Sequence, residues 1–183
     1  MSRRAFSPVW IHESLRAGEQ AKKRADSLMS GEVGHGFHYQ GVRQAQLWLD
    51  VHRTHAPLFS DPAFTEIFRA ISATTADSLA GRAVHVIGLG AGGGEKEAWL
   101  LQALCDAGCW LRYTPVDASF ELALLSAEAA EPWVDAEILP VAGDLSLLTE
   151  FPAWLERYPA EEIRVYTAYG LTPNFMPSRL SPE

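Results

Sequence analysis

A run of glycines directly after a short apolar segment constrains the fold of this 183-residue chain more than any other feature. The apolar residues 83–87 have the length and composition of a strand buried on both faces of a parallel sheet. Five of the seven residues at 88–94 are glycine, and Glu95 and Lys96 then begin a helical pattern. A strand, a glycine-rich turn and a helix in this order are typical of a nucleotide-like cofactor site, because a backbone without side chains lets a ligand approach closely.

Strands and helices alternate over the rest of the chain. The expected strands are 83–87, 110–116, 137–141 and 163–168, and the expected helices between them are 95–107, 120–130 and 146–157. Strands that alternate with helices of about a dozen residues predict βαβ units and a parallel sheet. We therefore expect an α/β, Rossmann-like domain over residues 82–183, with a partial parallel sheet of about four strands and helices on both faces.

Residues 1–81 predict a helical segment, or lid, in front of this domain. Helices are expected over residues 8–30, 42–54 and 62–79. The third is the clearest, because Asp61 can cap it and Pro62 occupies its first position. Its apolar residues fall on one face at spacings of three and four, and they are Phe64, Ile67, Phe68 and Ile71.

Composition excludes several classes of partner. A formal net charge of −8 disfavours a general nucleic-acid surface, because phosphate contacts need a basic stripe. No apolar run approaches the roughly 18 residues of a membrane span. Cys105 and Cys109 are too few for a disulfide framework and are expected to be reduced thiols. These features together predict a cytoplasmic protein with a small-molecule substrate and with neither nucleic-acid nor membrane partners.

Three charged residues are placed to complete a cofactor site. Asp117 follows the second expected strand, at a tip outside the core, where a carboxylate can accept both hydroxyls of a ribose. Asp144 follows the third expected strand and can accept a hydrogen bond from the adenine amine. Lys96, in the first turn of its helix, suits a cofactor carboxylate. Each of these residues can also be explained without a ligand. The two aspartates can be helix caps, and Lys96 can be an exposed lysine on its helix.

The glycine segment alone does not identify the cofactor. It satisfies G-x-G-x-x-G through Gly88, Gly90 and Gly93, so NAD is an alternative. A turn without any ligand is less consistent with the segment, because glycine this dense is conformationally costly. The Gly-Asp-Leu sequence that contains Asp144 and Leu145 favours S-adenosyl-L-methionine over NAD.

Histidines offer a weaker signal. His35 with His38, and His52 with His55, form two H-x-x-H pairs, but neither has a Cys or Glu partner, so we expect no metal. His38 or His55 would suit a general base that deprotonates an amine. His85 alternates within the first strand and is expected in the core. No catalytic residue can be assigned with these patterns alone.

Four segments of the chain, which include the glycine loop and both aspartates, cover residues 86–96, 113–119, 143–145 and 170–175. Together they resemble the histidine-specific methyltransferase family, which includes the Nα-methyltransferase of ergothioneine biosynthesis. The resemblance implies a class I, S-adenosylmethionine-dependent methyltransferase that acts on a small, histidine-like acceptor. It implies that Gly90, Lys96 and Asp117 bind the cofactor, with Asp144 and Leu145 around the adenine. With Gly88 and Gly92 of the same loop, these residues make up the expected cofactor site. The resemblance also places the acceptor near Tyr39 and Asn174, and we add His55 as a further candidate.

Two features separate the chain from this family. Where the family carries paired tyrosines, this sequence has Thr54-His55-Ala56-Pro57, so the methyl acceptor stays open. The chain also stops at Glu183, soon after the fourth expected strand, whereas a full class I sheet continues. We therefore expect a fragment, a shortened relative or one piece of a larger assembly, and a homo-oligomer through the exposed edge of the fourth strand. The alternatives to an active methyltransferase are a non-catalytic cofactor-binding or interaction module and an NAD(P)-dependent oxidoreductase.

Overall fold

A parallel sheet forms the centre of the protein. The computed structural model describes residues 8–33, 40–145, 155 and 157–169. Its five-stranded sheet has the order β1-β4-β3-β2-β5, and every pairing is parallel. The strands are β1 (Trp10–Ile11), β2 (Ala83–Leu89), β3 (Trp110–Asp117), β4 (Val141–Ala142) and β5 (Ile163–Thr167). The expected α/β class is confirmed, and the arrangement is compatible with a Rossmann-like fold.

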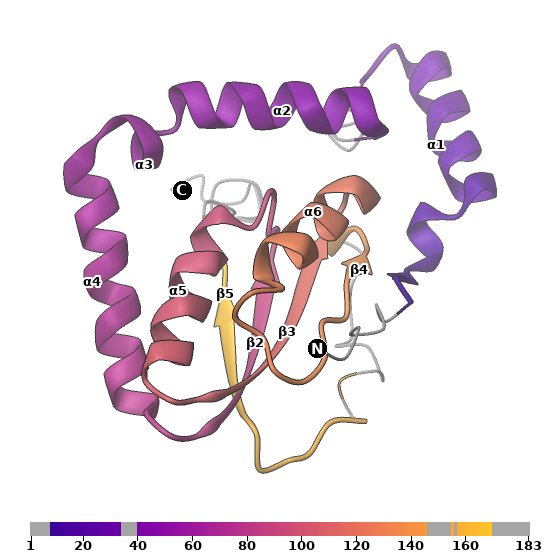
Figure 1. The fold of residues 1–183 in the computed structure, drawn as a ribbon. Helices are drawn as coiled ribbons and strands as arrows, with labels where there is room; N and C mark the ends of the chain where they lie inside the picture. The colour runs from indigo at the N-terminus through magenta and orange to yellow at the C-terminus, as the bar shows by residue number, and fades with distance from the viewer. Residues whose placement is uncertain (1–7, 34–39, 146–154, 156, 170–183) are drawn as a thin grey trace, which may run out of the picture.

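The helices form an inner layer and an outer frame, which Figure 1 shows. The elements are α1 (Ala17–Ser30), α2 (Val42–His55), α3 (Pro57–Ser60), α4 (Pro62–Leu79), α5 (Glu95–Asp106) and α6 (Phe120–Ala130). Helices α5 and α6 lie directly against the sheet, whereas α1, α2 and α4 enclose this unit on three sides. None of the helices in the described part of the chain has the length and apolarity of a membrane span.

One face of the sheet packs against α5, α6 and one side of α4. Alternate residues of β2 and β3 point toward this face, and they meet side chains of α4, α5 and α6. The fully buried members of this apolar cluster include Val84, Val86, Leu101, Leu104, Leu111 and Tyr113. These central strands follow the sequence prediction closely because they are buried on both faces, so their residues form continuous apolar runs.

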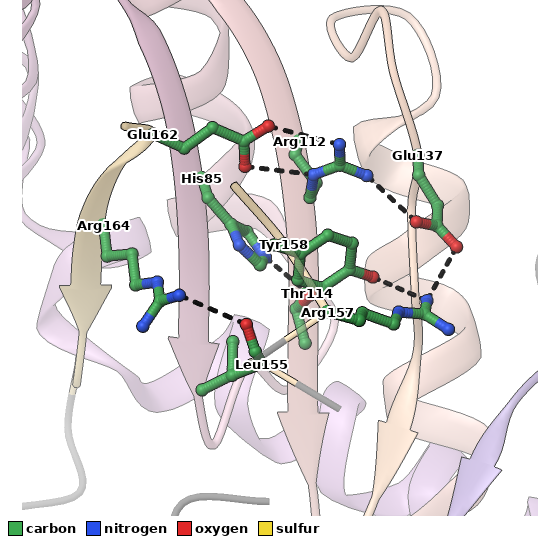
Figure 2. Close-up of polar contacts among 9 residues, drawn as sticks. All are labelled: His85, Arg112, Thr114, Glu137, Leu155, Arg157, Tyr158, Glu162 and Arg164. Atoms are coloured by element: carbon green, nitrogen blue, oxygen red, sulfur yellow. Dashed lines mark hydrogen bonds and ion pairs between the residues drawn. The ribbon is translucent and has the colours of Figure 1, made fainter. Parts of the chain in front are cut away.

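The opposite face carries a polar cluster toward the beginning of the strands (Figure 2). Arg112 makes a bidentate ion pair with Glu162, with both N–O distances at 3.2 Å, and also binds Glu137 at 2.9 Å. The Arg112 guanidinium lies 4.2 Å from the ring centroid of Tyr158, whose ring contacts the buried side chain of His85. The helix predicted over 146–157 falls outside the described residues, except for Leu155 and Arg157.

The segment predicted as one helix over residues 8–30 is instead three elements. Trp10–Ile11 forms β1, Glu13–Leu15 forms a short 3-10 helix, and α1 begins only at Ala17. The Trp10 amide donates to the Pro140 carbonyl at 2.9 Å, and the His12 amide donates to the Ala142 carbonyl at 2.8 Å. The prediction was wrong because pairing with β4 overrides the local helical preference, and it adds a fifth strand to the sheet.

The third predicted strand, 137–141, is also much shorter than expected. Only Val141–Ala142 forms the strand β4, and upstream of it Ile138 makes an isolated bridge to Tyr113. Pro115 of β3 faces β4, as Tyr113 and Asp117 do, and has no N–H to donate, so it interrupts the ladder between these two pairings.

Helix α4 begins as predicted, with the Asp61 side chain accepting from the Ala63 amide at 2.9 Å and Pro62 in the first turn. Its buried side is not centred on the predicted apolar stripe, however. Ser72 and Ala76 are the buried residues of this helix, whereas Phe64, Ile67 and Ile71 are 46%, 53% and 52% exposed.

Candidate functional site

The glycine loop (residues 88–94) joins β2 to α5 at the carboxyl edge of the sheet. Gly92 has a φ of 57°, and a Cβ at this position would lie 3.0 Å from the Trp48 ring. Gly88 approaches β3 so closely that a Cβ would lie 3.0 Å from the hydroxyl of Tyr113. Packing within the protein therefore requires these two glycines, and glycine density alone does not identify a ligand site.

Most of the loop's amide groups already have acceptors within the protein. The amides of Gly90 and Ala91 both donate to the Val116 carbonyl, at 2.8 and 3.2 Å. The Gly92 amide donates to Asp117 at 3.0 Å, and the Gly94 amide donates to the Ala91 carbonyl at 3.1 Å. The first three of these N–H groups hold the loop against β3 and the fourth closes a turn within the loop, so none of the four is available to an anionic ligand.

Asp117, the last residue of β3, links this strand to the loop. Its Oδ2 accepts from Gly92, its Oδ1 accepts from the Ser119 amide at 2.9 Å, and the residue is only 7% exposed. Burial raises the pKa of this carboxyl to about 6, and the hydrogen bonds from the backbone oppose that shift. Asp117 is thus buried, not at a tip outside the core. A carboxylate offers about four acceptor sites, so two remain for a ligand hydroxyl.

The first turn of α5 brings three charged residues to the loop. Glu95 forms an ion pair with Arg53 of α2 at 2.7 Å. Lys96 reaches across to the end of β5, where its Nζ donates to the Tyr169 carbonyl at 3.2 Å, and burial lowers the pKa of this amine. An ammonium has three donors, so Lys96 keeps two for a ligand carboxylate.

Glu97 is the buried acid of this turn, and no sequence pattern distinguishes it from an ordinary helix glutamate. Its side chain is fully buried and accepts a hydrogen bond from the Thr167 hydroxyl at 3.2 Å. Burial raises the pKa of the Glu97 carboxyl to about 7. A glutamate in a first helical turn is common because it complements the helix dipole, so its burial could be known only from the fold.

Helix α2 lies across the loop (Figure 1) and carries an aromatic stack. The Trp48 ring, which contacts Gly92, stacks on His52 with centroids 4.7 Å apart, and His52 meets the edge of Phe59 at 5.5 Å. Burial and then the positive charge of Lys96 lower the pKa of His52. The sequence singled out His55 instead, but His55 is exposed at the end of α2.

The two expected adenine contacts, Asp144 and Leu145, follow β4, on the other side of β3 from the glycine loop. Asp144 is paired with Lys23 of α1 at 3.4 Å. Leu145 is half-buried and packs against the apolar cluster of the sheet's second face.

The structure gathers part of the predicted site at one edge. Gly88, Gly90, Gly92, Lys96 and Asp117 come together there, whereas Tyr39, His38 and Asn174 lie outside the described residues. Within residues 8–33, 40–145 and 157–169, no group of three or more His, Cys, Asp or Glu side chains is arranged to hold a metal ion.

No protein-family model matches the sequence, and no curated protein matches it either. Function is therefore inferred from the geometry of the loop, of Asp117 and of the first turn of α5.

Proposed function

We propose that this protein is an S-adenosylmethionine-dependent methyltransferase that acts on a small amino-acid-like acceptor. The observation that carries the proposal is the acidic first turn of α5. Glu95 and Glu97 flank Lys96 at the helix end that meets the glycine loop. Lys96 can bind a carboxylate there, and Glu95, which also pairs with Arg53, can bind an ammonium, whereas Glu97 is buried and does not face a ligand. The two accessible charges of opposite sign suit the carboxylate and ammonium of an amino-acid-like cofactor end.

The same turn is unsuited to a dinucleotide. A pyrophosphate binds to loop amides and to a helix N-terminus, where positive potential favours it. Here four amides of the loop donate within the protein, and two carboxyl groups lie in the first helical turn. S-adenosylmethionine has no phosphate, so neither feature opposes it. These contacts support the methyltransferase over an NAD(P)-dependent oxidoreductase, although the strand order β4-β3-β2-β5 is also compatible with part of a dinucleotide-binding sheet.

Each site residue has a role in this proposal. Asp117 accepts hydrogen bonds from the ribose hydroxyls with its remaining acceptor sites, and Lys96 binds the cofactor carboxylate. Asp144 accepts from the adenine amine. The cofactor supplies an activated methyl group on a sulfonium, so the protein has only to bind, orient and exclude water. Trp48 and the rest of α2 lie over the loop and can exclude water there.

A non-catalytic module is the second candidate, and one observation favours it. The N-terminal helices already contact two of the proposed cofactor residues, because Trp48 packs on Gly92 and Lys23 pairs with Asp144. These contacts would have to rearrange for a cofactor to reach both residues.

Two measurements test these proposals in order. Calorimetry of the purified chain with adenosylhomocysteine and with NAD should show binding of the first only; binding of NAD alone would overturn the cofactor assignment. Formation of adenosylhomocysteine from S-adenosylmethionine should then be followed with histidine and other amino acids as acceptors. Binding without turnover by any acceptor would favour the module over the enzyme.

A further inference from the structure

The carboxyl group of Glu97 is buried against the glycine loop, and it makes no contact with the ligand in the proposed function. Glu97 is 2% exposed. A Cβ on Gly88 of the loop would lie 3.3 Å from the Glu97 Cγ, and the Thr167 hydroxyl donates to the Glu97 Oε1 at 3.2 Å. None of the ion pairs between described residues includes Glu97. Its negative charge is therefore desolvated without a paired cation, so its protonation state responds readily to nearby charges.

Two consecutive residues of α5 hold the same segment at the end of β5. Glu97 accepts from Thr167, the last residue of β5, and the Lys96 Nζ donates to the carbonyl of Tyr169, two residues later, at 3.2 Å. The two charged groups are therefore close enough to interact. The positive charge of Lys96 lowers the pKa of Glu97, and the negative charge of Glu97 raises the pKa of Lys96, in each case against a larger effect of burial.

The other titratable groups around Glu97 come from α5, β3 and the end of β5. Glu95 of the same helical turn raises the pKa of Glu97, but its carboxylate is held in an ion pair with α2. Tyr113 of β3 and Tyr169 also interact with Glu97. Burial raises the pKa of both tyrosine hydroxyls, that of Tyr169 to about 12, so both are neutral near pH 7. Lys96 is therefore the charge through which a ligand can act on Glu97.

We propose that Glu97 takes up a proton from the solvent when the carboxylate of an amino-acid-like ligand binds to Lys96. The proposal rests on the proposed function, because it takes Lys96 as the residue that binds this carboxylate. A bound carboxylate offsets the positive charge of Lys96 and adds a negative charge near Glu97, and both effects favour the protonated form of Glu97. Glu97 acts through Lys96 and does not touch the ligand, so it is a positioning residue that makes binding depend on pH.

Calorimetry measures this proton uptake when adenosylhomocysteine is bound at pH 7.5 in buffers that differ in ionisation enthalpy. Burial raises the pKa of Glu97 to about 7, so the group is about three-quarters ionised in the free chain at this pH. The wild-type chain should therefore take up about half a proton per ligand. Glu97→Gln, which keeps the acceptor for Thr167, should bind with almost no uptake. Glu128→Gln, at an exposed position of α6, is the matched control and should behave like the wild type.

A second ligand and two outcomes make this test specific. Methylthioadenosine, which lacks the amino-acid end, should bind without proton uptake by the wild-type chain. Uptake that persists in Glu97→Gln would assign the proton to Lys96, whose pKa is lowered by burial, and would overturn the proposal. Binding of adenosylhomocysteine by the wild type without any uptake would overturn it as well.

Urea denaturation without ligand tests the coupling of Lys96 to Glu97 separately. The stability that is lost through Glu97 as the pH rises is given by comparing Glu97→Gln with the wild type. In a Lys96→Met background this loss should continue to a higher pH, because the ammonium that favours the ionised form of Glu97 is gone. Equal pH dependence in both backgrounds would overturn this inference alone. No binding of adenosylhomocysteine would overturn the proposed function and the uptake with it, so the two failures can be told apart.

Discussion

Trp48 and Gly92 are in direct contact, although they lie on different elements and far apart in the sequence. A Cβ on Gly92 would be 3.0 Å from Cη2 of Trp48. The φ of 57° at Gly92 also disfavours any side chain there. The contact makes α2 and the glycine loop a single packed unit at the carboxyl edge of the sheet.

Gly92→Ala should therefore destabilise the protein by about 2–4 kcal/mol, which combines left-handed backbone strain with overpacking against the indole. Gly108→Ala is the matched control, because Gly108 also has a positive φ of 74° but has nothing within 4 Å of a Cβ. The control should cost only about 1 kcal/mol. Urea denaturation measures both. Trp48→Leu should recover part of the loss in Gly92→Ala, and an additive double variant would show that the two residues do not interact.

Asp117→Asn should weaken adenosylhomocysteine binding by about 1–3 kcal/mol, because the variant loses a charged acceptor. The wild-type affinity should also fall as the pH drops below about 6, since burial raises the pKa of Asp117 to about 6 and its protonated form cannot accept from both hydroxyls. Calorimetry at several pH values should show that this dependence disappears in Asp117→Asn. Asp106→Asn, at the exposed end of α5, should bind like the wild type. Wild-type affinity for Asp117→Asn would exclude Asp117 from the ligand contact.

Glu97→Gln should stabilise the protein more at pH 8 than at pH 5. Burial raises the pKa of Glu97 from 4.5 to about 7 in the folded chain, so the folded state retains a proton that the unfolded state releases. The stability that this group contributes is therefore lost as the pH rises from 4.5 through 7, by up to about 3 kcal/mol. Glutamine keeps the acceptor for Thr167 and has no charge to bury. Denaturation at both pH values measures the difference, and equal effects at both would show that Glu97 ionises normally.

His85→Gln should reduce the loss of stability in acid. Burial and then the nearby Arg112 and Arg164, which Figure 2 shows around His85, lower the pKa of His85 from 6.5 to about 3. The folded chain therefore keeps this ring neutral. The unfolded chain binds a proton below 6.5, and stability is therefore lost as the pH falls from 6.5 toward 3. Between pH 6 and pH 4 the variant should lose about 1 kcal/mol less per pH unit than the wild type. His55→Gln, on the exposed end of α2, is the control and should follow the wild type.

The sequence predicted the elements whose signals are local. The capping of α4 by Asp61, the apolar runs of β2 and β3, and the extent of α6 at Phe120–Ala130 all depend on neighbouring residues. It did not predict β1, because Trp10 and Ile11 become a strand only through pairing with Val141 and Ala142. No local pattern encodes that pairing.

The site was predictable in its position but not in its contacts. A glycine loop after a strand, with an aspartate after the next strand, predicted that the loop and Asp117 lie together, and the Gly92 amide does donate to Asp117. Asp144 and Leu145 were expected with them but lie on the other side of β3.

The contacts and charge states of the site residues depend on burial, which the sequence does not show. Asp117 and Glu97 have raised pKa values because of what covers them, and His52 joins the cluster because α2 lies across the loop. The spacing of residues along the chain does not show which elements pack over Asp117, Glu97 and His52.

The pairing of β1 with β4 has a consequence for synthesis on the ribosome. Trp10 is made well before Val141, which belongs to the strand that it pairs with. Until then the segment around Trp10 has no sheet to join, and the outer edge of β3 is also uncovered, because β4 lies between them. Contacts between residues so distant along the chain are slow to form. Between the synthesis of β3 and that of β4 the nascent chain therefore has an uncovered sheet edge, and this is when chaperone contact would matter most.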